Sequence, residues 1–410
     1  MFTSDCLSIN EQGHLTIGEC DTVALAKKYG TPLYVLDEDK VRDTCARYIS
    51  SFRKFYHGFG RPIYASKAFS CKEICRIVTQ EGLDIDVVSA GEIYTAVSAG
   101  VPAQKLHFHG NNKTFTELSY AIEQKVGDIV VDNLQELQTI NDISREKNVI
   151  TNISMRIKPG VDAHTHEFIR TGQIDSKFGF ALETGEALSA VKCAIDDEWV
   201  SLTGLHCHIG SQVIDVSPFV LAAEVMLDFY AKIKATYHKT LYSLNLGGGF
   251  GSKYLTTDKT LPYEEYMKAV SVAIKSKCKA LDLDTPEIFI EPGRSIVAEA
   301  GITLYTVGNV KEIPCVRNYV SIDGGMFENP RYALYQADHT CLLANKAGLP
   351  TEYLATVAGK CCESGDLIQE NANIQKPEAG DIMAVLSTGA YNYSMASNYN
   401  RNPRPGCVMT

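Results

Sequence analysis

The chain of 410 residues is 45% hydrophobic and 21% charged, which is typical of a globular protein too large for one ordinary core, so we expect two domains. Its formal net charge is −10 at pH 7 and it has no basic stripe, which argues against nucleic acid as a partner. The N-terminus shows no signal-peptide pattern, and no run of 18 apolar residues predicts a membrane span. Thirteen cysteines without C-x2-C pairs predict reduced thiols in the cytoplasm.

Short β-rich apolar runs recur along the chain, with helical stretches between them. In chain order, the eight central runs are residues 63–66, 84–89, 106–109, 128–132, 153–157, 202–208, 242–246 and 288–291. The helical stretches include residues 71–81, 91–99, 115–125, 134–147 and 218–237. Eight strands that alternate with helices predict an α/β fold, a (β/α)8 TIM barrel over residues 38–295, with an open doubly wound sheet as the competing arrangement.

The two flanks of the chain carry strand-like runs and few long helical patterns. The N-terminal flank has such runs at residues 15–17 and 32–36. The C-terminal flank has them at residues 303–310, 319–322, 353–357 and 382–386. We therefore predict that residues 1–37 and 296–410 form one β-rich domain of sandwich or barrel type, built from both ends of the chain.

Lys67 follows the first central run, directly after Ala65 and Ser66. A lysine at that point would be drawn toward the interior among small or apolar neighbours, where burial of an unpaired ammonium lowers its pKa by roughly 3–5 units. A protein tolerates that cost where the amine works in its neutral form or as an imine. The alternative is an ordinary surface lysine just past a strand.

Polar residues and glycines stand at the predicted carboxyl ends of all eight strands, where barrel enzymes place their chemistry. In chain order these positions are Lys67, Asp86, His109, Asp132, Arg156, His208, Gly247–Gly249 and Glu291. Packing alone is a poor explanation for such a set, so we predict an active site at this end of the barrel.

The glycines after the seventh strand favour a phosphate site, because barrels commonly bind phosphate there through backbone N–H groups. The dinucleotide fingerprint G-x-G-x-x-G fits poorly, since no acidic residue follows at the end of a neighbouring Rossmann strand, so we predict phosphate without NAD. After the eighth strand, Glu291 could hold a ring nitrogen protonated, and Arg294 or Ser295 could bind a phosphate or carboxylate. A flexible turn and a surface ion pair are the alternatives for these two segments.

Three His-x-His pairs motivate a rival function, that of a metal-dependent barrel hydrolase. The pairs are His107/His109, His164/His166 and His206/His208, and in a strand the two members of a pair share one face. Carboxylates that would complete a metal site are not obvious at the matching strand ends, and His208 can instead stack on an aromatic cofactor. We therefore predict no metal.

The C-terminal flank carries a candidate acid–base pair, Cys362 and Glu363, within residues 361–366. A thiol can carry a proton to a carbanion, and Tyr391 follows a strand from which it could reach the same site. Purely structural cysteines are the alternative.

Five motifs occur in one order that resembles the fold-type III pyridoxal phosphate enzymes, the group of alanine racemase and ornithine decarboxylase. They are residues 64–68, 208–212, 247–249, 291–294 and 362–366. The likeness also covers HFHGNNK at 107–113, SKFGF at 176–180, RYALY at 331–335 and residues 389–400, so it spans nearly the whole chain. Each motif is modest alone, but their joint occurrence is highly specific.

The resemblance implies roles for the matching residues. Lys67 would hold pyridoxal 5'-phosphate as an imine, His208 would stack on its ring, and Glu291 would keep the ring nitrogen protonated. The implied cofactor-binding set is Lys67, Asp86, Arg156, His208, Ser211, Gly247, Gly248, Gly249, Glu291, Gly293, Arg294 and Tyr391. The implied catalytic set is Lys67, His208, Cys362 and Glu363, and the implied substrate-binding set is Arg294, Arg331, Tyr335, Glu363 and Tyr391.

The same resemblance implies a homodimer with shared active sites, because Cys362 and Glu363 of such enzymes serve the partner subunit. The chain departs from the family at Tyr332, which follows Arg331 where the family usually has proline. The local backbone at that point is therefore left open.

Within the family, the chain is most similar to enzymes that act on meso-2,6-diaminopimelate. The likeness implies a carboxy-lyase that forms L-lysine and CO2, the last step of lysine biosynthesis, with Cys362 of the partner subunit as the acid that reprotonates the α-carbon. Decarboxylases of D-ornithine or D-lysine, of arginine or of carboxynorspermidine remain alternatives. A racemase is disfavoured because racemases of this fold use a lysine and tyrosine pair, and a non-catalytic regulator is disfavoured because Lys67, Glu291 and Cys362 are all present.

Overall fold

The computed structural model describes residues 2–161 and 175–410, which form two compact units. The barrel unit consists of described residues within Thr44–Gly251 and Leu261–Gly293, and the β-unit of those within Met1–Asp43, Ser252–Thr260 and Arg294–Thr410. The domain boundaries that we drew at residues 37/38 and 295/296 stay a prediction. Among the described residues, no helix is long and apolar enough to cross a membrane.

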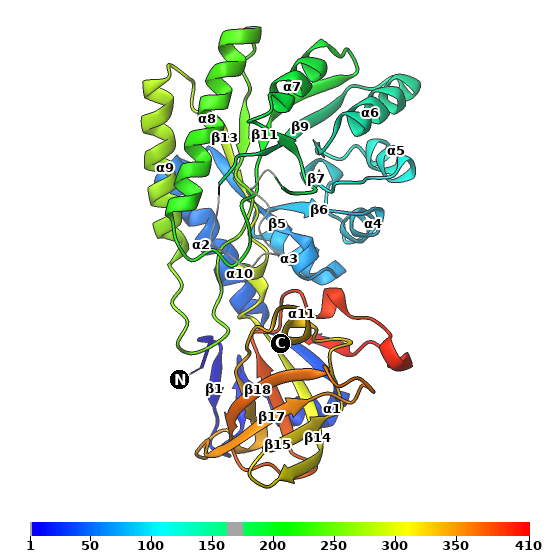
Figure 1. Cartoon of the computed structure of the whole chain (residues 1–410), viewed down its shortest axis with the longest axis vertical. Coiled ribbons are helices and arrows are strands. Elements are labelled where there is room, and N and C mark those ends of the chain that lie inside the picture. Colours follow the sequence, from blue (N-terminus) through cyan, green and yellow to red (C-terminus); the bar gives the residue numbers. More distant parts are fainter. Residues whose placement is uncertain (1, 162–174) are drawn as a thin grey trace. The chain divides into compact units, whose positions relative to one another are not determined.

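Strands lie at the centre of the barrel unit, with helices around them (Figure 1). Eight of these strands are parallel and pair into a closed ring. In spatial order the strands are β5 (Gly60–Ala65), β6 (Asp84–Val87), β7 (Leu106–Phe108), β8 (Asp128–Val131), β9 (Thr151–Lys158), β11 (Val200–His206), β12 (Ser243–Asn245) and β13 (Glu287–Ile290). The pairing of β13 with β5 closes the ring, and the two-residue β10 (Phe180–Ala181) adds to β9. The predicted TIM barrel is confirmed and the open sheet was the wrong alternative.

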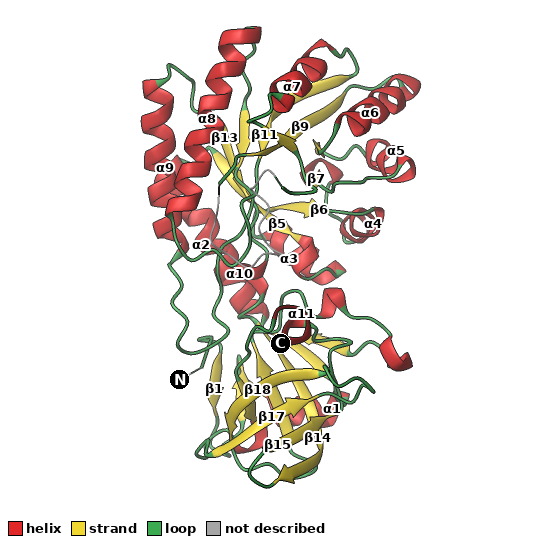
Figure 2. Ribbon diagram, in the orientation of Figure 1, coloured by secondary structure: helices red, strands yellow, loops and turns green. Residues whose placement is uncertain are grey.

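Helices alternate with these strands and lie outside them (Figure 2). They are α2 (Glu38–Tyr56), α3 (Lys72–Gln80), α4 (Ala90–Ser98), α5 (Phe115–Gln124), α6 (Leu134–Lys147), α7 (Glu186–Asp196), α8 (Ser217–Tyr237) and α9 (Tyr263–Ala280). Local sequence sets several of their ends: Thr114 and Glu117 form a capping box at the start of α5, and Asn133 caps α6. The two helices end at Lys125 and Asn148, which adopt the left-handed conformation.

The β-unit contains two sheets, the helix α1 (Thr22–Tyr29) and the short helices α10 (Arg294–Val297) and α11 (Arg331–Tyr335). The small sheet consists of β1 (Leu7–Ile9), β2 (Leu15–Ile17) and β3 (Cys20–Asp21). The large sheet consists of β16 (Cys341–Leu343), β19 (Ile382–Leu386), β14 (Gly301–Ile313), β15 (Arg317–Ile322), β17 (Tyr353–Ala358), β18 (Leu367–Ile374), β4 (Leu33–Leu36) and β20 (Gly406–Met409). Because β4 of the N-terminal flank pairs with β14 and β20, both ends of the chain build one sheet, as predicted.

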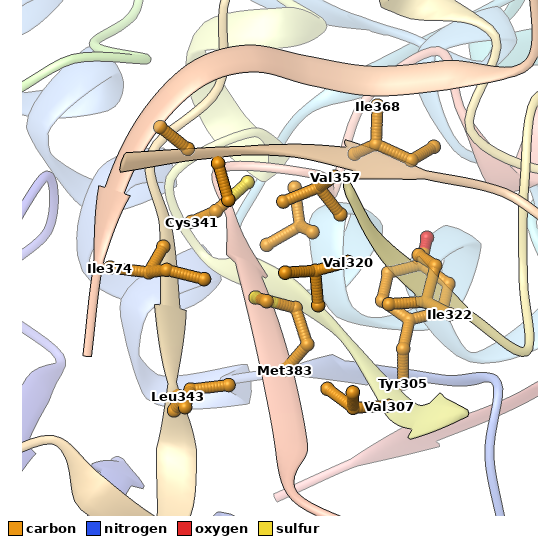
Figure 3. Packing of buried hydrophobic residues seen from close by; sticks show 13 residues of the cluster. Tyr305, Val307, Val320, Ile322, Cys341, Leu343, Val357, Ile368, Ile374 and Met383 are labelled. Carbon is orange, nitrogen blue, oxygen red and sulfur yellow. The ribbon is translucent and has the colours of Figure 1, made fainter. Parts of the chain in front are cut away.

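Strands β14 and β19 bury side chains on both of their faces. Tyr305 and Met383 belong to the cluster of Figure 3, which also draws on β15, β16, β17 and β18. Their sequence neighbours Leu304 and Ala384 belong to a second cluster with residues of β2 and β4. Since neighbouring strand residues point to opposite faces, burial on both sides explains why β19 is a continuous apolar run in the sequence.

Candidate active site

The predicted site residues fall into two sets, one in each unit. The barrel set lies at the carboxyl ends of the strands or in the loops that follow, and consists of Lys67, Asp86, Arg156, His208, Ser211, Gly247–Gly249, Glu291 and Gly293. The β-unit set consists of Arg294, Arg331, Tyr335, Cys362, Glu363 and Tyr391.

Lys67 lies in a one-turn 3-10 helix, η1 (Ser66–Ala68), that begins directly after β5. We expected the lysine to be drawn into an apolar interior, and that expectation was wrong because its side chain is 41% exposed. The strand ends at Ala65, and Lys67 lies in the 3-10 turn that follows it. Lys67 Nζ lies 3.7 Å from Oδ2 of Asp86, which is fully buried at the end of β6. A carboxylate therefore faces the amine.

Glu92 was not predicted as a site residue, yet it ties the ends of two barrel strands together. Its Oε2 accepts hydrogen bonds from Ser66 Oγ and from the backbone N–H of Val88, both at 2.8 Å. Ser89 caps α4 by accepting from the N–H of Glu92, so the S-x-x-E spacing was the available signal. The carboxylate reaches past the helix cap to the residue next to Lys67, and burial raises its pKa.

Glu291, directly after β13, is a buried carboxylate that lies close to an asparagine and two histidines. Asn245 Nδ2 donates to its Oε1 at 2.7 Å, and the Nε2 atoms of His206 and His109 lie 3.2 Å and 3.0 Å from the same oxygen. Burial alone would raise the pKa of Glu291, but the two imidazoles hold it well below its usual value. Burial lowers the pKa of His206 to about 4. We conclude that an ionised carboxylate stands inside the barrel next to a neutral imidazole.

His109, His206 and Glu291 also form a cluster whose ligand atoms all lie within 4.8 Å of one another, close enough to hold a metal ion. The two histidines of this cluster come from different His-x-His pairs. The cluster therefore differs from the metal site considered above, in which both histidines of one pair would bind the same ion. His107 instead faces two aspartates, buried Asp84 at 3.5 Å and partly buried Asp128 at 4.0 Å, and His164/His166 lie outside the described residues. His206 makes a hydrogen bond with Glu291 at 3.3 Å, whereas Nε2 of His109 lies 3.0 Å from the carboxylate and has no hydrogen-bond partner. A carboxylate beside two imidazoles is an ordinary arrangement in a protein interior and does not require an ion.

The glycine loop after β12 runs close to a neighbouring strand end. A Cβ on Gly248 would lie 2.1 Å from the carbonyl oxygen of Glu291, and Gly247 has a φ of +70°. Gly293 follows the same strand end, where a Cβ would lie 2.9 Å from that of Ala65 at the end of β5. At these positions only glycine lets the backbones approach so closely.

His208 is fixed against this loop as a neutral imidazole. The backbone N–H of Gly248 donates to its Nδ1 at 3.1 Å, so that nitrogen carries no proton. Desolvation, together with the positive charges of Lys67 and Arg156, holds the pKa of His208 well below its usual value. Ser211 is half-buried three residues further along.

Arg156 and Asp86 place opposite charges inside the barrel unit. The Arg156 guanidinium lies 4.1 Å from the centre of the Phe178 ring, and its Nε lies 4.0 Å from Oδ1 of Asp132. Both carboxylate oxygens of Asp86 are buried without a hydrogen-bond partner. Because a buried carboxylate is costly without donors, Asp86 indicates that a further donor group binds here.

In the β-unit, Tyr254 brings two predicted arginines together. Its hydroxyl accepts a hydrogen bond from Arg294 Nη1 at 2.5 Å, and the Arg331 guanidinium lies 3.5 Å from the centre of its ring. Arg294 also lies 4.6 Å from the ring centre of Tyr391, and Tyr335 is the last residue of α11, which Arg331 begins. Tyr254 could not be predicted from the sequence, because it stands 40 residues before Arg294 outside every motif.

Cys362 and Glu363 are exposed on a loop whose backbone is held firmly. Buried Asp366 accepts a hydrogen bond from the N–H of Cys361 at 2.7 Å, and the N–H of Cys362 donates to Oδ1 of Asn400 at 2.7 Å. The loop is therefore fixed while its thiol and carboxylate face outward.

Tyr332, which stands where the family usually has proline, anchors α11. Its hydroxyl donates to Oε2 of Glu370 on β18 at 2.5 Å, and Arg317 Nη1 donates to the other oxygen at 2.6 Å. The helix that carries Arg331 is thus attached to the sheet through a side chain.

Known enzymes match both the sequence and the fold along the whole chain. Residues 40–298 match the family of pyridoxal-dependent decarboxylases, pyridoxal binding domain. The chain is 48% identical to a diaminopimelate decarboxylase of Bacillus methanolicus, over 100% of this chain and 94% of the relative, and 47% identical to that of Bacillus subtilis, over 100% and 93%. The crystal structure of diaminopimelate decarboxylase from M. jannaschii has a TM-score of 0.93 and 36% identity, over 100% of this chain and 93% of that one. The chain therefore belongs to the diaminopimelate decarboxylase family of pyridoxal-dependent decarboxylases.

Proposed function

We propose that this carboxy-lyase decarboxylates meso-2,6-diaminopimelate to L-lysine and CO2, the last step of lysine biosynthesis. The observation that carries the proposal is the ionised, buried carboxylate of Glu291, held by Asn245 and two histidines at the strand end next to the glycine loop. The relative from M. jannaschii was also solved with L-lysine, which is the product of this reaction.

The barrel set fits pyridoxal 5'-phosphate. Asp86 has buried oxygens that lack donors, the loop at Gly248 has no room for a side chain, and Glu291 has the charge that a protonated ring nitrogen requires. When bound, the cofactor supplies an electron-accepting ring for the carbon that loses CO2. The residues proposed to hold it are Lys67, Asp86, Arg156, His208, Ser211, Gly247–Gly249, Glu291, Gly293, Arg294 and Tyr391.

Each group of the barrel set would do a separate task. Lys67 would bind the cofactor covalently through Nζ, and Asp86 would balance the positive charge at that nitrogen. Glu291 would keep a proton on the ring nitrogen, since its own pKa lies well below the usual value. His208, neutral and fixed by Gly248, would pack on the ring face without adding a charge that opposes the ring proton.

The β-unit set would bind the substrate and return a proton to it. Arg331 forms no ion pair with any described residue, and its Nε is buried without a hydrogen-bond partner, which suits it to a carboxylate. Arg294, Tyr335 and Tyr391 would complete the grip on the substrate. Because analogues without a second carboxylate lose these charge-assisted contacts, we expect the enzyme to reject them strongly.

We further propose a homodimer in which Cys362 and Glu363 serve the active site of the partner subunit. Cys362 Sγ would give a proton to the α-carbon that has lost CO2, and Glu363 would hold the ammonium of the far end of the substrate. Both side chains are exposed on a fixed loop, as groups offered to another chain must be. All thirteen cysteines are free thiols, which supports a reducing, cytoplasmic location.

The purified protein tests this proposal directly. We expect a visible absorption band from bound pyridoxal phosphate that shifts when meso-diaminopimelate is added, and release of CO2 from that substrate in preference to D-ornithine, D-lysine, arginine and carboxynorspermidine. Lys67→Ala should lose the covalent band and the activity. A band that persists in Lys67→Ala would refute the assignment of that lysine, whereas no turnover of meso-diaminopimelate would refute the substrate. Activity lost on chelation but kept in Lys67→Ala would instead support a metal-dependent hydrolase.

A further inference from the structure

Tyr254 connects the two arginines of the β-unit through different parts of its side chain. The hydroxyl accepts the hydrogen bond from Arg294, while the ring face lies 3.5 Å from the centre of the Arg331 guanidinium. The Arg294 guanidinium lies 5.8 Å from the same ring centre. An aromatic face attracts guanidinium groups, so this tyrosine holds two like charges close together.

Tyr254 is itself held in place. Only 2% of it is exposed, its carbonyl oxygen accepts from Thr340 Oγ1 at 2.9 Å, and its N–H donates to Asp258 Oδ2 at 2.9 Å. The His339 ring meets its edge at a centroid distance of 5.4 Å, and its Nδ1 lies 3.0 Å from the carbonyl oxygen of Leu386. Burial lowers the pKa of His339 to about 3, so this neighbour fills space without adding charge.

The charge of Arg331 calls for an anion. Among the residues that the structure describes, it forms no ion pair, and its Nε is buried without a partner. A planar carboxylate can take two parallel hydrogen bonds from a guanidinium. The contact with the Tyr254 ring, at 3.5 Å from the ring centre, restrains the Arg331 guanidinium and hence the positions from which it can bind such a group.

We propose that Tyr254 is a positioning residue that determines specificity, because it orients Arg294 and Arg331 for the carboxylate at the far end of the substrate. This inference rests on the proposed function, since it requires a substrate with two carboxylates. Tyr254 acts through the arginines and need not touch the substrate.

The stereochemistry of the reaction provides a built-in comparison. Because L-lysine is the product, the carboxylate that leaves belongs to the D-centre, and the L-centre keeps its own. Both meso-diaminopimelate and L-lysine therefore carry the far carboxylate, whereas D-lysine has the reacting end but no far carboxylate. A loss of arginine positioning should weaken the first two ligands and leave D-lysine unaffected.

The test uses two variants of the full-length enzyme loaded with its cofactor. Tyr254→Phe removes the hydroxyl and keeps the ring under Arg331, and Tyr254→Leu removes both. We expect KM for meso-diaminopimelate to rise about tenfold in Tyr254→Phe and about 100-fold in Tyr254→Leu, since a hydrogen bond to a charged group and a stacked cation are lost in turn. The inhibition constant of L-lysine should rise in parallel. The turnover number kcat, the visible band and the small kcat/KM that the wild type retains for D-lysine, a poor substrate, should stay within about threefold.

Tyr353→Phe is the matched control, because its hydroxyl on β17 also donates to a charged side chain, that of Glu312, at 2.9 Å. This variant should behave as the wild type. Unchanged meso-diaminopimelate KM and L-lysine inhibition in Tyr254→Phe would overturn the inference, and so would equal losses with D-lysine, which indicate a general structural role. A wild type that ignores meso-diaminopimelate would refute the proposed function instead. Should Tyr254→Leu not fold, the near-isosteric Tyr254→Phe decides.

Discussion

Replacement of Glu291 by glutamine removes a negative charge from the barrel with little change in shape. The wild-type carboxylate has Asn245 Nδ2 at 2.7 Å and the Nε2 atoms of His109 and His206 at 3.0 and 3.2 Å. The amide oxygen of glutamine can still accept from Asn245, and a neutral imidazole can change its tautomer to meet the new amide N–H. The fold should therefore survive, and only the charge opposite the ring nitrogen is lost.

The size of the effect follows from the electrostatics of a buried charge. A unit charge about 4 Å from another contributes about 4 kcal/mol at an effective dielectric constant of 20. At about 1.4 kcal/mol per tenfold, the loss of that interaction should lower kcat about 1,000-fold. The KM for meso-diaminopimelate should change only a few-fold, because the residues assigned to the far end of the substrate are untouched.

The assay is steady-state CO2 release, with the visible band as the measure of cofactor binding. Glu287→Gln is a matched control, because Glu287 begins the same strand, is half-exposed and pairs with Arg61 at 2.9 Å. We expect the control to keep full activity and Glu291→Gln to keep its band while losing kcat. A Glu291→Gln enzyme that binds the cofactor and works within tenfold of the wild type would refute the role of this carboxylate.

Three further changes test the surroundings of the site. Burial raises the pKa of Glu328 to about 7, so the stability that its neutral form contributes is complete below pH 4.5 and is lost as the pH rises through 7. In urea denaturation, Glu328→Gln should be more stable than the wild type by about 1–3 kcal/mol at pH 8 and equal to it at pH 4.5. Equal stability of the two proteins at both pH values would contradict the raised pKa. Lys113→Met should cost about 3–5 kcal/mol of unfolding free energy by leaving the buried carboxylate of Glu136 unpaired, and adding Glu136→Leu should restore most of it; additive losses would rule out the pair. Tyr332→Phe should raise KM for meso-diaminopimelate about two- to tenfold with kcat unchanged, because α11 loses its hydrogen bond to Glu370, and unchanged kinetics would show that Arg331 does not depend on this anchor.

Local patterns in the sequence were enough to predict the barrel. Apolar runs of strand length alternate with helical stretches, and parallel strands covered on both faces are continuous apolar runs. All eight observed strands overlap the predicted runs, and α6 spans the predicted residues 134–147. The strand-end rule then placed Lys67, Asp86 and Glu291 at one end of the barrel, because chain direction fixes which end of a parallel strand carries the loop.

The surroundings of those residues could not be read in the same way. The groups around Glu291 come from β11, β12 and the end of β7, and only closure of the barrel brings them to one carboxylate. Lys67 was expected among apolar neighbours, yet it is partly exposed and faces Asp86, because the 3-10 turn after β5 sets its direction.

Patterns along the chain were thus enough to predict the barrel, the cofactor class and the family, since these depend on periodicity, chain direction and the order of motifs. The charge that each group carries, and the groups that it faces, depend on the folded structure. Glu291 is ionised, His208 is neutral and Arg331 stacks on Tyr254 through contacts between residues far apart in the chain. Burial and neighbouring charge set those properties, and both arise only when distant segments pack together.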